Sequence, residues 1–123
     1  MKIIVVDDEK DVQLLFEQKF RREKRKGMLD FQFMLSAEEA LEYLRTVDVT
    51  GIRLVLSDIN MPGMNGLELL KIIRDKFPLL KVIIITAYGN DSYYQQAMEY
   101  GADDFITKPL DFDKLKANFT EKA

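Results

Sequence analysis

The segment Ile3-Ile4-Val5-Val6-Asp7-Asp8-Glu9 has four successive β-branched apolar residues, followed at once by three acids. A strand that is buried on one face alternates apolar and polar residues, whereas a strand of a parallel sheet is covered on both faces and is apolar throughout. The same continuous pattern recurs at Leu54–Leu56 and Val82–Ile85. These segments therefore predict buried parallel strands, the first of which ends in acids.

Five apolar runs alternate with segments of helical spacing along the chain. The runs are Ile3–Val6, Phe31–Leu35, Leu54–Leu56, Val82–Ile85 and Phe105–Thr107. Three apolar stripes each predict a helix with one buried face: Val12/Leu15/Phe16/Phe20, Ala40/Leu41/Leu44/Val47 and Leu67/Leu70/Ile73/Phe77. Two more helices are expected over 92–100 and 112–119. Because strands joined by right-handed helical crossovers form a parallel sheet, we expect a (βα)5 domain with helices on both faces.

Capping residues mark the expected helix ends. Ser36 with Glu39 predicts a capping box, and Asn65 opens the third helix with a similar cap. Asp111 is the expected N-cap of the last helix, and Gly101 is placed to end the fourth helix as a C′ glycine.

Composition narrows the chemistry that the chain could perform. Its 123 residues and 14.3 kDa fit one domain, and 18 Lys+Arg against 21 Asp+Glu leave a net charge of −3, which gives no case for direct nucleic-acid binding. The absence of Cys excludes disulfides, thiolate nucleophiles and sulfur-bound zinc. The absence of His removes the commonest general base. Any chemistry must rest on carboxylates, hydroxyls, Lys or a hard metal ion.

Targeting signals are not apparent in the sequence. No apolar run approaches the roughly 18 to 20 residues that span a bilayer, and the short apolar start lacks the length and cleavage site of a signal peptide. We therefore expect a cytoplasmic protein without a membrane partner.

Polar residues follow four of the predicted strands: Asp7 and Asp8, Asp58, Thr86 and Lys108. Each has an ordinary role when taken alone, as a turn residue, a helix cap or a solvated charge. Ligands of open parallel sheets bind beyond the carboxyl ends of the strands, where these residues would converge. Carboxylates without His or Cys form a hard oxygen site that suits Mg²⁺, and Lys and Thr would contact a bound phosphate. The set predicts a phosphoryl-transfer site.

Four signatures then identify a family resemblance: Val5-Val6-Asp7-Asp8-Glu9, Asp58-Ile59-Asn60-Met61-Pro62-Gly63-Met64-Asn65-Gly66, Thr86-Ala87 and Lys108-Pro109. Over essentially its whole length the chain closely resembles the receiver domain of two-component response regulators. The resemblance implies a doubly wound, flavodoxin-like α/β fold with strand order 2-1-3-4-5. It also implies that residues 1–123 are a single receiver domain, either stand-alone or excised from a longer regulator.

The resemblance assigns roles to the residues at the sheet edge. Asp58 would accept a phosphoryl group from a phosphohistidine of a sensor histidine kinase or phosphotransfer protein. Asp8, Asp58 and the main-chain carbonyl of Asn60 would bind Mg²⁺, and Asp7 would contribute through water. Lys108 would pair with the phosphoryl group.

The resemblance also implies a switch. Thr86 would move toward the phosphoryl group, Phe105 would rotate inward behind it, and the Lys108–Pro109 peptide would be cis. The face of the fourth helix, fifth strand and fifth helix would then control a downstream effector domain or protein, and phosphorylation-dependent dimerisation is a further implied outcome. Such a protein is not an enzyme in the usual sense, because it catalyses only its own phosphorylation and dephosphorylation.

Several residues depart from the common pattern of the family. Asn65 replaces a more frequent Asp, and Phe105 replaces a more frequent Tyr. Asn60 and Tyr88 stand where the family tunes hydrolysis of the acyl phosphate, and an aromatic ring at 88 could screen that group from water. At least one of the tyrosines at 93, 94 and 100 is expected to be exposed. The cations over 19–26 are interpreted as a solvated, helix-terminating cluster.

Other functions remain open at this point. A phosphorylation-independent interaction module on the same fold is the main alternative, and the intact acidic set argues against it. A hydrolase with Asp58 as nucleophile would resemble a different motif, with a second Asp where this chain has Asn60. A flavin-binding variant would need a hydroxyl- and glycine-rich first loop, whereas Asp7-Asp8-Glu9 would repel a cofactor phosphate.

Overall fold

The computed structural model describes residues 2–87, 89 and 91–121. Within these residues, five parallel strands form one sheet in the order β2-β1-β3-β4-β5. The strands are β1 (Lys2–Val6), β2 (Asp30–Met34), β3 (Ile52–Asp58), β4 (Val82–Thr86) and β5 (Asp104–Thr107). The predicted fold class and strand order are confirmed.

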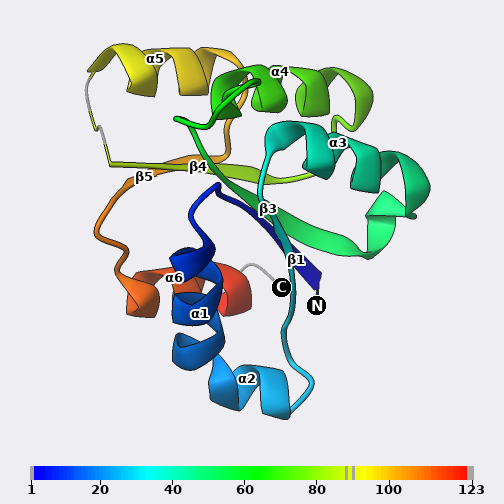
Figure 1. Cartoon of the computed structure of the whole chain (residues 1–123), viewed down its shortest axis with the longest axis vertical. Helices are drawn as coiled ribbons and strands as arrows, with labels where there is room; N and C mark the ends of the chain where they lie inside the picture. Colours follow the sequence, from blue (N-terminus) through cyan, green and yellow to red (C-terminus); the bar gives the residue numbers. More distant parts are fainter. Residues whose placement is uncertain (1, 88, 90, 122–123) are drawn as a thin grey trace.

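Helices cover both faces of this sheet (Figure 1). One face carries α1 (Lys10–Lys19), the short α2 (Arg21–Arg25) and α6 (Phe112–Glu121), and the other carries α3 (Ala37–Thr46), α4 (Gly66–Lys76) and α5 (Asp91–Glu99). A 3-10 turn, η1 (Val49–Gly51), precedes β3. None of the helices in the described residues combines the length and apolar character that a membrane span requires.

Two hydrophobic cores separate the sheet from its helices. Ile3 and Val5 pack into the core under α1 and α6, while Ile4 and Val6 pack into the core under α3, α4 and α5. Alternate residues of the strand therefore pack into opposite cores, which is why all four residues of Ile3–Val6 are apolar. Burial of the central strands on both faces fixes the direction in which their carboxyl ends point.

The first helix differs from the prediction. Its backbone breaks at Phe20, which has φ −112° and ψ 23°, and α2 begins at the next residue. Leu15, expected in the buried stripe, is 39% exposed, whereas Phe16 and Phe20 are fully buried. The stripe is narrow because α1 meets the sheet along positions four residues apart, Val12, Phe16 and Phe20.

The predicted caps are found with one difference. Asn65 Oδ1 accepts a hydrogen bond from the Glu68 N–H at 2.9 Å, and Glu68 Oε1 accepts one from the Asn65 N–H at 3.1 Å, which completes a capping box. Ser36 accepts from the Glu39 N–H, but the Glu39 carboxylate accepts from the Leu35 N–H rather than from that of Ser36. This second box is therefore only half formed.

The last two expected helix ends are confirmed. Asp111 Oδ1 accepts hydrogen bonds from the N–H groups of Asp113 and Lys114, which caps α6. Gly101 follows α5 with a φ of +93°, the left-handed conformation that a C′ glycine supplies.

Arg74 of α4 joins the segment that follows its own helix to the segment that precedes β5, 27 positions away. Its guanidinium donates to the carbonyl oxygens of Gly101, Pro78 and Leu80, and to the Asp103 carboxylate. All five N–H donors of the side chain are used. The end of α4 is thereby tied to the segments that enter β4 and β5.

A glycine at the start of α4 is required by a close backbone approach. A Cβ on Gly66 would collide with the carbonyl oxygen of Asp58, and the Gly66 N–H donates to the Ile59 carbonyl at 2.9 Å. We predict that Gly66→Ala lowers the free energy of unfolding by about 2 kcal/mol or more, because backbone rather than a flexible side chain must move. Gly51→Ala is the matched control, since an added Cβ there meets nothing within 4 Å.

Urea unfolding followed by far-UV circular dichroism measures both variants. Equal stability of Gly66→Ala and Gly51→Ala would show that the loop after β3 is not held against α4 as described.

Candidate functional site

Three carboxylates meet where β1 and β3 end. Val6 pairs with Ser57 in the sheet, so the following positions bring Asp7 beside Asp58. One carboxylate oxygen each from Asp7, Asp8 and Asp58 lies within 4.8 Å of the other two. Asp7 and Asp58 are buried, and Asp8 is exposed. The expected convergence of these side chains at one edge is therefore present.

The ammonium group of Lys108 faces the two buried acids. Lys108 Nζ donates a hydrogen bond to Asp7 Oδ2 at 3.2 Å and lies 3.7 Å from Asp58 Oδ2. The Lys108 N–H donates to the carbonyl oxygen of Thr86 at 2.8 Å, which holds the loop after β5 against the end of β4. The Lys108–Pro109 peptide is cis, as predicted.

Burial and like charge disfavour the ionised form of Asp58. Loss of solvent raises the pKa of this carboxyl to about 6, and the negative charge of Asp7 adds to the increase. The Lys108 ammonium and the Ile59 N–H, which donates to Asp58 Oδ1 at 2.9 Å, oppose it without cancelling it. The negative charge of ionised Asp58 is therefore only partly compensated by the residues around it.

The carboxylates of Asp7 and Asp58 favour the charged form of Lys108. Burial alone would lower the pKa of its ammonium, but the carboxylates of Asp7 and Asp58 raise it above the ordinary value. The amine is therefore held in its charged form. Among the described residues, the carboxylates of Asp7, Asp8 and Asp58 against the Lys108 ammonium leave an excess of two negative charges. Hard oxygen ligands with this excess of charge fit a divalent ion such as Mg²⁺.

The other predicted site residues surround this centre at different depths. Thr86 is fully buried at the end of β4, opposite Thr107 of β5. Asn60 is exposed on the loop that follows β3. Phe105 is half-buried and packs edge-on against Tyr94 of α5, with ring centroids 5.5 Å apart. This contact places Phe105 under α5.

Two expectations concern tyrosines. Tyr94 is 50% exposed, which confirms that at least one tyrosine of this region lies at the surface. Tyr88, expected near the acyl phosphate, lies outside the described residues.

Glu38 is a residue of the site region that the sequence analysis did not find. From the first turn of α3, its carboxylate accepts a hydrogen bond from the Met64 N–H at 3.2 Å and lies over Gly63, which has a φ of +77°. It thus steadies the loop between Asp58 and α4. Glu38 and Met64 are 26 residues apart and follow no motif, so no signal in the sequence connects them.

Comparisons with known proteins agree on one family. The family model described as response regulator receiver domain matches residues 3–120. The chain is 39% identical over 113 residues to the DNA-binding transcriptional regulator NtrC of Proteus hauseri, which covers 92% of this chain and 22% of NtrC. It is 36% identical over 115 residues to the sporulation initiation phosphotransferase F of Bacillus subtilis, with 94% of this chain and 87% of the relative covered.

A solved structure supports the same assignment. The response regulator TrrA of Thermotoga maritima, in complex with Mg²⁺ and a beryllium fluoride, is similar with a TM-score of 0.80 and 31% identity over 99% of this chain and 98% of TrrA. The fold and the acidic edge define a flavodoxin-like α/β domain with a cluster of carboxylates at the carboxyl ends of its strands. The chain belongs to the family of response regulator receiver domains. It spans about a fifth of the length of NtrC and most of the length of phosphotransferase F.

The raised pKa of Asp58 predicts how stability depends on pH in the absence of a metal ion. Between about pH 4 and pH 6 the folded protein keeps a proton on Asp58 that the unfolded chain has released, so stability falls as pH rises through this window. Asp58→Asn removes this cost. We predict that in EDTA the variant is more stable than the wild type at pH 7.5, by up to about 3 kcal/mol, and that the gain shrinks toward zero near pH 4.

Urea unfolding of both proteins at the two pH values measures the gain. A gain of the same size at pH 4 and pH 7.5, or a loss at pH 7.5, would contradict an unfavourable ionised Asp58.

Proposed function

We propose that Asp58 is the phosphoacceptor of this receiver domain. The observation that carries the proposal is the position of Lys108 Nζ, 3.2 Å from Asp7 and 3.7 Å from Asp58, which sets a cation beside the acceptor oxygen. The chain contains no His. A phosphohistidine donor would therefore come from a partner, either a sensor histidine kinase or a phosphotransfer protein.

Mg²⁺ is the proposed cofactor. Asp8, Asp58 and the main-chain carbonyl of Asn60 would hold it, and Asp7 would contribute through water. The close approach of three carboxylate oxygens and their excess negative charge support this assignment. When bound, the ion supplies positive charge to the oxygens of the transferred phosphoryl group.

The protein residues account for the remaining steps of the transfer. The Asp58 carboxylate is the nucleophile and needs no general base, because it reacts in its ionised form. A bond forms between its oxygen and phosphorus while the bond between phosphorus and the donor imidazole nitrogen breaks, and the electron pair returns to that nitrogen. The Lys108 ammonium stabilises the negative charge on the phosphoryl oxygens, and the Thr86 hydroxyl would move to donate a hydrogen bond to one of them.

The output of the switch is proposed on the face of α5, β5 and α6. Movement of Thr86 would free space for the ring of Phe105, which now contacts Tyr94 at the surface of α5. This change would alter the face offered to an effector domain, an effector protein or a second copy of the chain. We further propose that residues 1–123 are one receiver domain, stand-alone or part of a longer regulator, and that it works in the cytoplasm, where a kinase has access to ATP.

Phosphorylation by a small-molecule donor tests the proposal directly. With acetyl phosphate and Mg²⁺, we predict that intact-mass spectrometry detects one phosphoryl group on the wild type, and none on Asp58→Asn or in EDTA. Lys108→Ala should be phosphorylated about 100-fold more slowly, because one stabilising cation is lost. Lys24→Ala, which removes an exposed cation of α2, is the control and should react at the wild-type rate.

An adduct of equal yield on Asp58→Asn would assign the acceptor to another residue. Phosphorylation of Lys108→Ala at the wild-type rate would show that the Lys108 ammonium does not assist the transfer, and would contradict the proposal. Interaction with a partner that is unaffected by phosphorylation and by Asp58→Asn would favour a phosphorylation-independent module.

A further inference from the structure

A second surface lies at the opposite end of the sheet from Asp58, where β3 and β4 begin. We call it the basal groove, formed by residues 49–53 and 76–81. Two hollows, of about 430 and 370 Å³, meet at Leu79. The Leu79 side chain is 95% exposed, the largest value among the exposed large apolar residues of the described chain. Leu79 itself belongs to neither of the two cores, whereas Ile52 and Leu80 of the groove belong to the core under α3 and α4.

The floor of the larger hollow is apolar. Val49 and Phe77 are only partly buried, and they pack against Leu80 and the core under α3 and α4. A single exposed leucine is common on protein surfaces, but here the leucine borders a concave apolar surface. The hollow has the size and lining that would accept an apolar side chain from outside.

Three cations border the same groove: Arg53 and Lys81 line the second hollow, and Lys76 lines the first. None of the three forms an ion pair with any residue in the described part of the chain. Nη2 of Arg53 is buried and donates no hydrogen bond to a described residue. A buried guanidinium nitrogen without an acceptor is costly, so the Arg53 side chain would gain a hydrogen bond if it turned outward to a carboxylate or carbonyl oxygen of a ligand.

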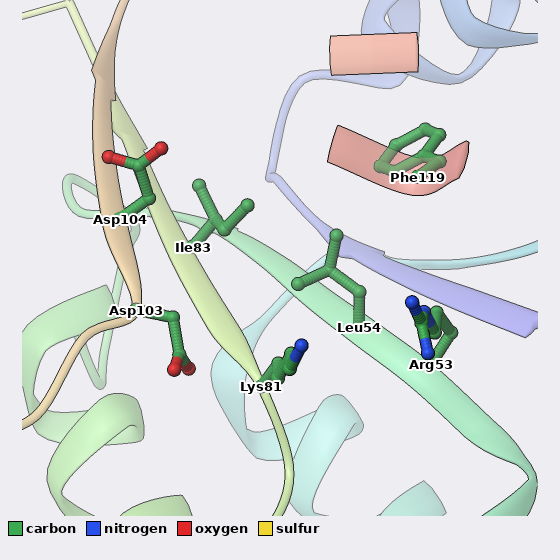
Figure 2. Close-up of a pocket in the computed structure, with 7 residues that line it drawn as sticks. All are labelled: Arg53, Leu54, Lys81, Ile83, Asp103, Asp104 and Phe119. Atoms are coloured by element: carbon green, nitrogen blue, oxygen red, sulfur yellow. The ribbon is translucent and has the colours of Figure 1, made fainter. Parts of the chain in front are cut away.

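The nearby acids are already engaged. Figure 2 shows Arg53 and Lys81 on either side of Leu54, with Asp103 and Asp104 farther away, just before β5 and at its first residue. Asp103 Oδ2 accepts hydrogen bonds from Arg74 at 3.1 Å and from the Val82 N–H at 2.8 Å.

Two other acids near the groove, Asp104 and Asp48, accept hydrogen bonds from residues next to them in the sequence. Asp104 Oδ1 accepts from the Phe105 N–H, and Asp48 Oδ1 accepts from the N–H and hydroxyl of Thr50. In the described part of the chain, none of these acids forms an ion pair with Arg53, Lys76 or Lys81.

We propose that the basal groove docks an acidic, apolar segment of a partner protein. An apolar side chain of that segment fills the hollow beside Leu79, and its carboxylates face Arg53, Lys81 and Lys76. The charge complementarity selects this occupant over a second copy, because a two-fold contact centred on Leu79 would bring the same cations against each other. The concave shape of the groove favours a peptide over the flat surface of a bilayer.

This docking site is independent of the proposed phosphoryl transfer. Asp58 lies at the carboxyl ends of the strands, and the groove lies at their amino ends. A partner bound at the groove leaves the acidic edge open to a kinase. We therefore expect the phosphorylated and the unphosphorylated chain to bind the segment with equal affinity.

A peptide selection tests the proposal. A phage-displayed library of random dodecapeptides is depleted on the Leu79→Ser/Lys81→Glu double variant and then selected on the wild-type chain. We expect enriched peptides that combine Asp or Glu with Leu, Ile, Phe or Met. By fluorescence anisotropy, the best synthetic peptide should bind at least 10-fold more weakly to Leu79→Ser, to Lys81→Glu and to Arg53→Gln, and more weakly in high salt.

Two exposed residues provide matched controls. Leu14→Ser and Lys24→Glu remove an apolar and a cationic side chain from α1 and α2, and neither should change binding. Because Leu79 and Lys81 are exposed, their variants should fold normally, which circular dichroism verifies.

Four results would overturn the proposal. They are failure to enrich peptides after the depletion, enrichment of peptides without acids, self-association of the wild type that Leu79→Ser abolishes, and Leu79-dependent pelleting with phosphatidylserine vesicles. None of them bears on phosphorylation of Asp58, so the two proposals can fail separately.

Discussion

Two buried carboxylates, Asp7 and Asp58, are held beside each other at the ends of β1 and β3 and face one ammonium group, that of Lys108. Burial of both strands on two faces prevents the acids from moving apart toward water. The pKa of Asp58 therefore rises to about 6. The fold thus keeps two like-charged carboxylates close together. A divalent cation bound between them would reduce their repulsion, and its positive charge would then be available to a transferred phosphoryl group.

The rest of the fold supports this arrangement from a distance. The Asn65–Glu68 capping box and the close contact of Gly66 with Asp58 hold the start of α4 against the end of β3. Arg74 ties the far end of α4 to the segments that enter β4 and β5. Segments at both ends of the sheet are thus tied to α4, and the carboxyl end carries the cluster of Asp7, Asp8 and Asp58. The amino end carries the unpaired cations of the basal groove.

Much of the fold follows from the sequence because continuous apolar runs have one common explanation, a parallel strand covered on both faces. That architecture also brings Lys108 to Asp7 across 101 positions. The break at Phe20 could not be predicted, since the cationic residues after it favour a helix and no glycine occurs before Gly27. The half-formed capping box could not be predicted either, because the N–H groups of Leu35 and Ser36 are neighbours and the Glu39 carboxylate accepts from that of Leu35. Glu38–Met64 and the groove around Leu79 arise only when distant loops meet.

The carboxyl carbon of Asp58 reports the strain at this site most directly. Its chemical shift can be followed against pH by ¹³C NMR of selectively labelled protein, first in EDTA and then with Mg²⁺. If burial and Asp7 disfavour the ionised form, the midpoint lies near pH 6 in EDTA and moves down when Mg²⁺ is added. A midpoint in EDTA at or below the ordinary value of 3.8, or one that Mg²⁺ leaves unchanged, would contradict a carboxylate cluster that requires a cation.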